Sequence, residues 1–407
     1  MPLRGSFIWS VDRGTMFLRP FWPRSVSVKT RRMVWLLLGV LLLHSVARAE
    51  EGVKDKEILI GMSTALTGPA SALGTGLKAG AGVYCDKINA RGGVQGRRIK
   101  LLAYDDGYEP DRAIANTRKL IEEDKVFALF GFVGIPTSTA VMPIFSKASV
   151  PYIAPFSGAE ILRNPVNKYL FNVRASYFDE TETMVEHLTR DLGIQKIGVF
   201  AQADAFGDAG RAGVVRALKK RDLHLAGDSK FVRNTVDVEE GLQALIKENP
   251  EAVVMVGPYK PCAAFIRKAK EKGFHPMFLT VSFVGTDALI KELGADGDGV
   301  IVTQVMPNPS DSPLPIVRQY LADMAAVEHK PDFMSLEGYV DAVVMVEALQ
   351  KSSSLDRTSF LSAFEGLDAS VGGLNIAFSP SSHQGMRQVF LTKIHKGKAV
   401  TISKFER

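Results

Sequence analysis

The feature that most constrains the fold is a regular alternation of short apolar runs with longer amphipathic stretches. The apolar runs EILIGM at 57–62, VFALFG at 126–131 and VPYIAPF at 150–156 are separated by helix-like stretches such as 76–90 and 110–124. Strands that alternate with helices in this way pair in parallel, and the helices cover both faces of the sheet. The pattern therefore predicts an α/β fold.

The alternation restarts after Arg174 and predicts a second α/β unit of similar size. Its apolar runs lie at 195–201, 252–257 and 276–281, and 299–305 reads as one more strand. A chain of this length ordinarily forms about two domains, which agrees with two units.

The C-terminal part has a different pattern. Residues 313–366 predict three helices, and residues 370–407 predict short strands. This change predicts that the tail adds structure to both earlier units.

The segment 24–49 has the pattern of a secretory signal peptide. Basic residues precede an uncharged run of ten residues at 34–43, and a small-x-small motif ends at Ala49. A membrane span needs about 20 apolar residues, so this run is too short for one. We predict that residues 1–49 are removed by cleavage after Ala49 and that the mature protein is periplasmic. An uncleaved anchor is the alternative, and Met16 is an alternative start.

The net charge of +6 belongs to this leader. Of 50 basic and 44 acidic residues, eight and one lie within residues 1–49, which leaves 42 and 43 in the remainder. A nearly neutral body argues against a nucleic acid as partner.

The chain lacks the motifs that indicate an enzyme. Its seven histidines do not fall at metal-ligand spacing, and neither GxSxG nor GxxxxGK[ST] occurs. We therefore predict no catalytic activity, no bound metal and no cofactor. Cys85 and Cys262 are predicted to be buried free thiols, although export would permit a disulfide between them.

One motif supports an alternative. Residues 74–79, GTGLKA, match the GxGxxA pattern of dinucleotide-binding turns. Those glycines should follow the first strand directly, whereas eleven residues, 63–73, separate them from a strand that ends near Met62. A NAD-dependent enzyme is therefore the less favoured alternative, and the segment better suits a loop and helix start that bind a polar solute.

Four segments rich in Gly and small hydroxyl residues follow predicted strands. Segments 132–139 and 154–160 belong to the first unit, and 256–261 and 280–287 belong to the second. Such residues also occur in ordinary turns. In open α/β sheets, however, ligands bind at the carboxyl ends of the strands. A ligand that touches all four segments would lie between the units.

Several short segments have a pattern known from one family. They are ILIGMSTALTGP in and after the first strand, INARGGVQGR at 88–97, YDD at 104–106 with PDRA at 110–113, and DAFGDAG at 204–210. Together they resemble the periplasmic solute-binding proteins of branched-chain amino-acid ABC uptake systems, typified by the leucine/isoleucine/valine-binding protein. The resemblance covers roughly residues 57–400.

This resemblance implies a type I periplasmic-binding-protein fold, with two doubly wound parallel-sheet lobes joined by three crossover strands. The lobes would comprise 57–173 plus 305–376, and 174–304 plus 377–407. It also implies a monomeric extracytoplasmic receptor that binds an amino acid or related small carboxylate between the lobes and delivers it to permease subunits in the inner membrane. A ligand-sensing receptor of the same fold that signals to a partner protein is the alternative.

The family's motifs imply a set of ligand-binding positions at the facing edges of the two lobes. In this chain they are Leu73, Ile135, Thr137, Ser138, Phe156, Ser157, Gly158, Tyr177, Asp204, Tyr259 and Ser282. The turn at 135–138 would offer amides and hydroxyls to a ligand carboxylate. The tyrosines would be aromatic contacts, with ordinary packing as the alternative.

Two of these positions depart from the family pattern. Ser282 stands where leucine-type proteins have an acid that meets the ligand ammonium, and Ile135 replaces a small hydroxyl residue. A neutral hydroxyl cannot form the same charge-assisted bond. Either Asp204 or Glu180 serves the ammonium instead, or the ligand is an aromatic or aliphatic carboxylate without an α-amino group.

Overall fold

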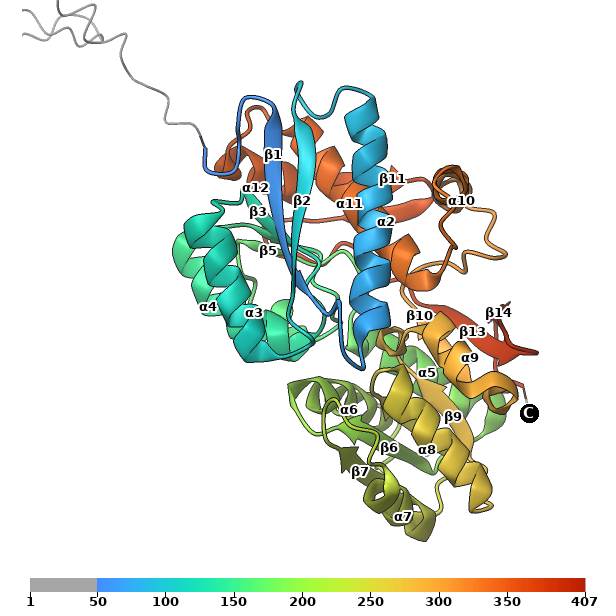
Figure 1. The fold of residues 1–407 in the computed structure, drawn as a ribbon. Coiled ribbons are helices and arrows are strands. Elements are labelled where there is room, and N and C mark those ends of the chain that lie inside the picture. The colour runs from blue at the N-terminus through green and yellow to red at the C-terminus, as the bar shows by residue number, and fades with distance from the viewer. Residues whose placement is uncertain (1–49, 407) are drawn as a thin grey trace, which may run out of the picture. The chain divides into compact units, whose positions relative to one another are not determined.

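The computed structural model describes residues 50–406, which form two large sheets flanked by helices (Figure 1). Most strand pairs in these sheets are parallel, so the predicted α/β class is confirmed. The predicted signal peptide, residues 1–49, lies outside the described residues.

The first sheet has five strands in the order β2-β1-β3-β4-β5, and all of its pairs are parallel. Its strands are β1 (Glu57–Thr64), β2 (Arg98–Asp105), β3 (Ala128–Phe130), β4 (Tyr152–Ile153) and β5 (Leu170–Phe171). Ile60 of β1 faces Leu101 of β2 and Ala128 of β3. Because helices cover both faces, β1 reads as one continuous apolar run.

The second sheet has seven strands in the order β14-β13-β10-β9-β8-β6-β7. Its strands are β6 (Ile197–Gln202), β7 (Gly227–Phe231), β8 (Ala252–Val256), β9 (Met277–Thr280), β10 (Ile301–Gln304), β13 (Phe390–His395) and β14 (Lys398–Ile402). The pairs of β13 with β10 and with β14 are antiparallel, and the others are parallel. A separate hairpin joins β11 (Asp368–Val371) and β12 (Leu374–Ala377).

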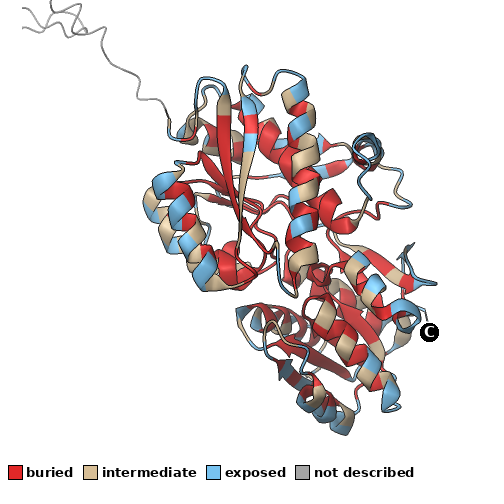
Figure 2. Ribbon diagram, in the orientation of Figure 1, coloured by how far each residue is buried: buried red, intermediate tan, exposed pale blue. Residues whose placement is uncertain are grey.

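Most α-helices of the described residues bury one face against these sheets or against each other, whereas α11 is buried on nearly all sides (Figure 2). The α-helices are α2 (Ser71–Ala90), α3 (Pro110–Arg118), α4 (Ile135–Ala148), α5 (Tyr177–Leu192), α6 (Ala205–Lys219), α7 (Glu239–Glu248), α8 (Tyr259–Glu271), α9 (Thr286–Leu293), α10 (Pro315–Ala326), α11 (Phe333–Lys351) and α12 (Arg357–Glu365).

We call the five-stranded sheet with α2–α4 and α10–α12 lobe 1, and the seven-stranded sheet with α5–α9 lobe 2. Helices α10 and α11 pack against α2, whereas β13 and β14 extend the sheet of lobe 2. The prediction that the tail adds structure to both units is therefore confirmed. The chain passes between the lobes after β5, after β10 and after β12. The predicted lobe boundaries lie in, or at the edge of, these connections and remain a proposal.

Helix α2 begins at Ser71, so GTGLKA lies inside the helix and not in a turn after β1. A Cβ at Gly74 would lie 2.2 Å from the Ala65 carbonyl oxygen, and one at Gly80 would lie 1.7 Å from the Ser335 carbonyl oxygen. Glycine is needed at both positions because the helix approaches other backbone segments closely. The small residues of this segment serve packing, and the turn that a dinucleotide fingerprint requires is not present there.

Cys85 and Cys262 are both buried and free, so the predicted thiols are confirmed and the disulfide alternative is wrong. Burial raises the pKa of each thiol to about 12. Within residues 50–406 no helix has the length and apolar character needed to cross a membrane. The same residues contain no group of three or more His, Cys, Asp or Glu side chains arranged to hold a metal ion.

Candidate functional site

Aromatic side chains from both lobes meet where the lobes contact each other. Phe283 of lobe 2 lies at ring-centroid distances of 5.3 Å from Phe156 and 6.0 Å from Tyr108, both of lobe 1. On its own lobe Phe283 lies 4.4 Å from Phe206, which lies 5.4 Å from Tyr177. All five side chains are 0% exposed. We call these five residues the interlobe aromatic cluster.

Tyr108 reaches the cluster because of the loop between β2 and α3. Its backbone has φ 66°, and the Asp106 carboxylate accepts its N–H at 2.8 Å. A Cβ at Gly134 would lie 2.3 Å from the Tyr108 ring, so the ring rests directly on that glycine. The Tyr108 hydroxyl accepts a hydrogen bond from Nε2 of Gln202 in lobe 2 at 3.2 Å. Tyr108 thus connects the two lobes.

Several buried polar atoms in this region lack a hydrogen-bond partner among the described residues. They include Oε1 of Gln202, Nε of Arg174 and Nε of Arg233. The Tyr177 hydroxyl has none within 3.5 Å, although Ser157 is near enough to act against the rise of its pKa. Buried polar atoms normally have partners, because an unmet hydrogen bond costs about 1–3 kcal/mol.

The segment predicted to bind a carboxylate forms the start of α4. Gly134 precedes the helix with φ 91° and gives it no side-chain cap. The Thr137 hydroxyl donates to the Val133 carbonyl, and the Ser138 hydroxyl pairs with that of Tyr152 at 2.9 Å, all within lobe 1. The predicted hydroxyls thus have internal partners. The first-turn N–H groups of Ile135 and Thr137 have no intrahelical acceptor, as in any helix, and can receive an anion.

The predicted segment 156–158 lies beside the start of α4, since Gly134 N–H donates to the Phe156 carbonyl at 3.0 Å. The Gly158 carbonyl accepts the Tyr177 N–H at 2.7 Å, and a Cβ at Gly158 would lie 2.6 Å from that nitrogen. The Ser157 hydroxyl accepts the N–H of Ala159 at 3.4 Å. The tight approach at Gly158 positions Tyr177 in the cluster.

Leu73 and Tyr259, predicted from opposite lobes, come together at Gly285. A Cβ at Gly285 would lie 2.6 Å from Leu73 Cδ2 and 3.7 Å from Tyr259 Cδ1. Both side chains are buried, at 0% and 5% exposure. The structure therefore brings these two predicted residues to one place at the lobe contact.

Asp204 caps the N-terminus of α6. Its Oδ1 accepts the N–H of Phe206 at 2.9 Å, and its Oδ2 accepts from Gln202 Nε2 at 2.7 Å. Arg233 lies 3.5 Å from Oδ2. The carboxylate therefore orders the loop after β6 and holds Gln202 toward Tyr108.

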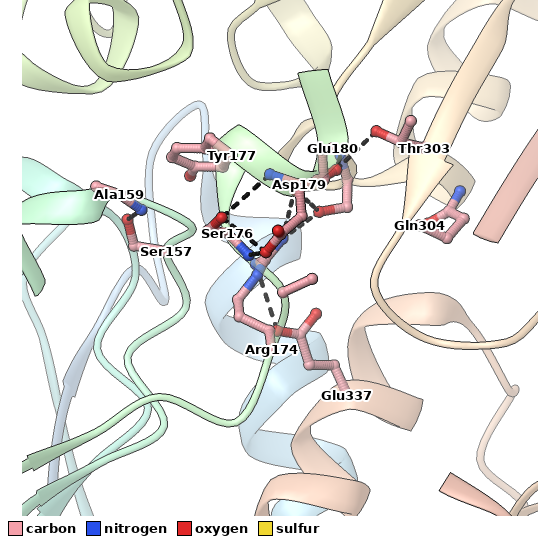
Figure 3. A network of polar contacts seen from close by, with 12 residues as sticks. Ser157, Ala159, Arg174, Ser176, Tyr177, Asp179, Glu180, Thr303, Gln304 and Glu337 are labelled. Carbon is pink, nitrogen blue, oxygen red and sulfur yellow. Dashed lines mark hydrogen bonds and ion pairs between the residues drawn. The ribbon is translucent and has the colours of Figure 1, made fainter. Parts of the chain in front are cut away.

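A buried network of charges is centred on Arg174, with Glu180 and Glu337 on either side of it (Figure 3), and Ser282 belongs to this network. The Arg174 guanidinium donates to the Ser282 hydroxyl and lies 3.6 Å from Glu180 of α5 and 3.3 Å from Glu337 of α11. Glu180 also accepts the Ser282 N–H and the Thr303 hydroxyl, each at 2.7 Å. Because Glu337 belongs to lobe 1 and Glu180 to lobe 2, Arg174 connects the lobes at the first crossover.

Burial sets the protonation of this network. Burial raises the pKa of Glu180, whereas Arg174 and the hydrogen bonds from Ser282 act to lower it. It raises the pKa of Glu337 to about 7, although Arg174 opposes the shift. It also raises the pKa of Asp341, one turn further along α11, well above the ordinary value. Three acids, Glu180, Glu337 and Asp341, thus surround Arg174, and Arg163 acts on Glu337 as a second buried arginine.

A second contact between the lobes lies near the surface. The Arg233 guanidinium of lobe 2 lies 2.8 Å from the Glu109 carboxylate of lobe 1, and Asn234 Nδ2 donates to the same carboxylate at 2.6 Å. Arg233 also lies 6.0 Å from the centroid of the Tyr108 ring. We call Glu109, Arg233 and Asn234 the interlobe latch.

Sequence reasoning missed Tyr108, Gln202, Phe206 and Phe283 as parts of this region. Phe206 lies inside the DAFGDAG motif and Phe283 directly follows Ser282, so the motifs pointed near them. Tyr108 follows the YDD motif by two residues, and this closeness to a family motif was the feature of the sequence that could have pointed to it.

A family model described as "Periplasmic binding protein" matches residues 57–399. The chain is 25% identical over 389 residues to Leu/Ile/Val-binding protein homolog 7 of Brucella abortus (strain 2308), which covers 89% of this chain and 96% of that protein.

Solved structures show the same arrangement. A possible leucine/isoleucine/valine-binding protein from Rhodopirellula baltica superposes with a TM-score of 0.82 at 36% identity, and covers 88% of this chain and 98% of its own. A fatty acid ABC transporter substrate-binding protein from Thermomonospora curvata superposes with a TM-score of 0.80 at 23% identity. The superposition covers 87% of this chain and 93% of the other protein.

Proposed function

Because this chain belongs to the periplasmic binding protein family and has its type I fold, we propose that it is an extracytoplasmic solute receptor of an ABC uptake system. It binds an amino acid or related small carboxylate between its two lobes and delivers it, as a monomer, to permease subunits in the inner membrane. Its signal peptide directs it to the periplasm and is cleaved after Ala49. The resemblance and the type I fold stated from the sequence are confirmed.

The observation that carries this proposal is the interlobe aromatic cluster. Its rings come from both lobes, and Oε1 of Gln202 beside it has no hydrogen-bond partner among residues 50–406. A solute that touches both sets of groups gains all of its contacts only when the lobes are together. Such a solute shifts the population toward the closed form, which is the signal a permease can read.

The carboxylate of the solute is proposed to lie at the start of α4. The free first-turn amides of Ile135 and Thr137 are there, and the positive end of the helix dipole favours an anion. The apolar part of the solute would then face the aromatic cluster, with Leu73 and Tyr259 at its edge.

A solute panel tests this function. We expect the correct carboxylate to raise the melting temperature and to reduce the radius of gyration measured by small-angle scattering. A panel of amino acids, aliphatic acids and aromatic acids that leaves both quantities unchanged would contradict the proposed function.

Replacing Arg233 with alanine is expected to weaken solute affinity about threefold to tenfold. The change removes the ion pair with Glu109 and lowers the population of the closed form, which reduces the apparent affinity in proportion. Calorimetric titration measures the affinity, and scattering of the free protein should show an increased radius of gyration.

Arg211→Ala is the matched control, because Arg211 pairs with Asp228 inside lobe 2. It should leave both measurements unchanged. An Arg233→Ala protein that binds as tightly as the parent would show that the interlobe latch does not set the closed population.

A further inference from the structure

Arg163 is a buried arginine on the loop that leads from the predicted segment 156–158 to β5. It directly follows the short 3₁₀ turn Glu160–Leu162 of lobe 1, and it is 6% exposed. This loop is fixed to lobe 1, because Nδ2 of Asn172, just after β5, donates to the Leu162 carbonyl at 2.8 Å. The Arg163 guanidinium therefore extends from a held point of lobe 1.

The Arg163 guanidinium donates to backbone carbonyls of two separate segments. Nη1 donates to the Ser157 carbonyl at 3.2 Å and to the Ala159 carbonyl at 3.0 Å. Nη2 donates to the carbonyls of Arg174 and Ala175, at 3.1 Å and 3.4 Å. The first two carbonyls lie in and beside the segment predicted to bind solute, and the last two belong to the first crossover between the lobes. One side chain thus holds the two segments together.

Backbone carbonyls, and not carboxylates, are the partners of Arg163. Among residues 50–406 it forms no ion pair, whereas the neighbouring Arg174 lies between Glu180 and Glu337. Burial, and after it repulsion from Arg174, lowers the pKa of Arg163 to about 10, so it remains a cation at neutral pH. A buried cation is unfavourable unless its donors find acceptors. The planar fork of a guanidinium can supply donors to two segments at once, which a lysine ammonium cannot do in the same geometry.

The two segments also contact each other directly. Tyr177 N–H donates to the Gly158 carbonyl at 2.7 Å, so the crossover lies beside the predicted segment (Figure 3). Lobe closure turns the chain at the crossovers, where a few residues absorb the change in φ and ψ. A turn at residues 174–175 shifts the carbonyls that Arg163 binds. Arg163 then carries this shift to the carbonyls of Ser157 and Ala159.

We propose that Arg163 is a positioning residue that couples the first crossover to the segment 156–158, so that opening and closing of the lobes changes the geometry of this segment. This inference rests on the proposed function and adds to it a connection between the crossover and the solute site.

Hydrogen exchange without added solute tests the coupling. The secreted protein is unfolded and refolded to remove carried-over solute, and mass spectrometry follows peptides 157–163 and 174–179 in increasing, sub-denaturing urea. In the parent protein we expect both segments to have the same protection within about threefold and the same dependence on urea, because one guanidinium holds both. Different urea dependences in the parent would overturn the proposal.

Arg163→Lys should separate the two segments. The lysine keeps the charge but lacks the fork that reaches both pairs of carbonyls. We expect exchange in both segments to become at least tenfold faster and their urea dependences to differ, while peptides of β6 and β8 exchange as in the parent. Exchange that is faster by one common factor throughout the chain would show a merely structural role and overturn the proposal. Unchanged exchange in either segment would overturn it as well.

Arg357→Lys is the matched control, because Arg357 also donates to two backbone carbonyls, both within lobe 1. They are those of Phe127 at 2.9 Å and Val126 at 2.8 Å. This variant should speed exchange near residues 126–128 and leave 157–163 and 174–179 unchanged. If it also separates those two segments, the coupling does not depend on Arg163 and the proposal is wrong. Since no solute is added, that result would leave the receptor function standing, and a negative solute panel would not affect this test.

Discussion

Replacing Arg174 with methionine is expected to lower the free energy of unfolding by about 3–5 kcal/mol at neutral pH, as for other buried ion pairs that lose one partner. The change leaves Glu180 and Glu337, at 0% and 2% exposure, without the cation between them. It also removes the donor to Ser282. Urea titration followed by circular dichroism measures the loss.

Arg190→Met provides the matched control. Arg190 pairs with Glu186 on the exposed face of α5, and such pairs contribute about 0.5 kcal/mol or less. Adding Glu337→Gln to Arg174→Met should recover part of the lost stability, because one buried carboxylate is then neutral. Equal stability of the Arg174 and Arg190 variants would show that the buried network does not hold the lobes together.

Stability is expected to fall as the pH rises from about 4.5 through about 7, and Glu337→Gln should remove a large part of that fall. Burial raises the pKa of Glu337 from 4.5 to about 7 in the folded protein. Between these pH values the folded state holds a proton that the unfolded chain has released. The contribution of Glu337 to the free energy of unfolding is therefore full at low pH and is lost as the pH rises through about 7. One such group contributes on the order of 3 kcal/mol across this interval.

The other titrating groups around Glu337 define the background for this measurement. Arg174 and Arg163 oppose the rise of its pKa, Glu180 adds to it, and Asp341 on the same helix also has a raised pKa. Glu347→Gln is the control, since Glu347 lies on the same helix but pairs with exposed Lys351. Its urea midpoints should follow the parent at every pH. If the profile of Glu337→Gln also runs parallel to that of the parent, the fall in stability does not come from the raised pKa of Glu337.

The alternation of strands and helices could be predicted because parallel strands are buried on both faces and read as apolar runs. The exact ends of the strands could not be predicted, because they depend on local backbone geometry. The run VPYIAPF predicted a strand over 150–156, yet β4 contains only Tyr152 and Ile153. Ala154 adopts φ 53°, which interrupts the strand, and Phe156 then pairs with Val133 only as an isolated bridge. No periodicity in the sequence encodes that single backbone angle.

Helix α9 was missed for a similar reason. The segment 280–287 was read as a binding loop because of its Gly and hydroxyl residues, whereas Thr286 begins a helix of eight residues. Gly285, with φ 78°, ends the preceding turn and starts this helix. Glycine marks both turns and helix starts, so its presence alone does not distinguish them.

The motifs located the lobe contact better than they assigned individual roles. Leu73, Phe156, Tyr177 and Tyr259 are all buried where the lobes meet. Ser282, however, is bound to residues 102 and 108 positions away in the chain. Because those partners come together only through the fold, the family resemblance pointed to a missing acid at position 282 but not to the network around Ser282.

The discontinuous construction of both lobes has a consequence for how this protein is made. Lobe 1 needs α11, which packs on α2, and lobe 2 needs β13 and β14, which complete the sheet beside β10. A ribosome that has reached residue 300 has therefore supplied the complete core of neither lobe. Neither lobe can therefore complete its core until residues near 402 have been synthesised, so the two lobes are finished together at the end of the chain.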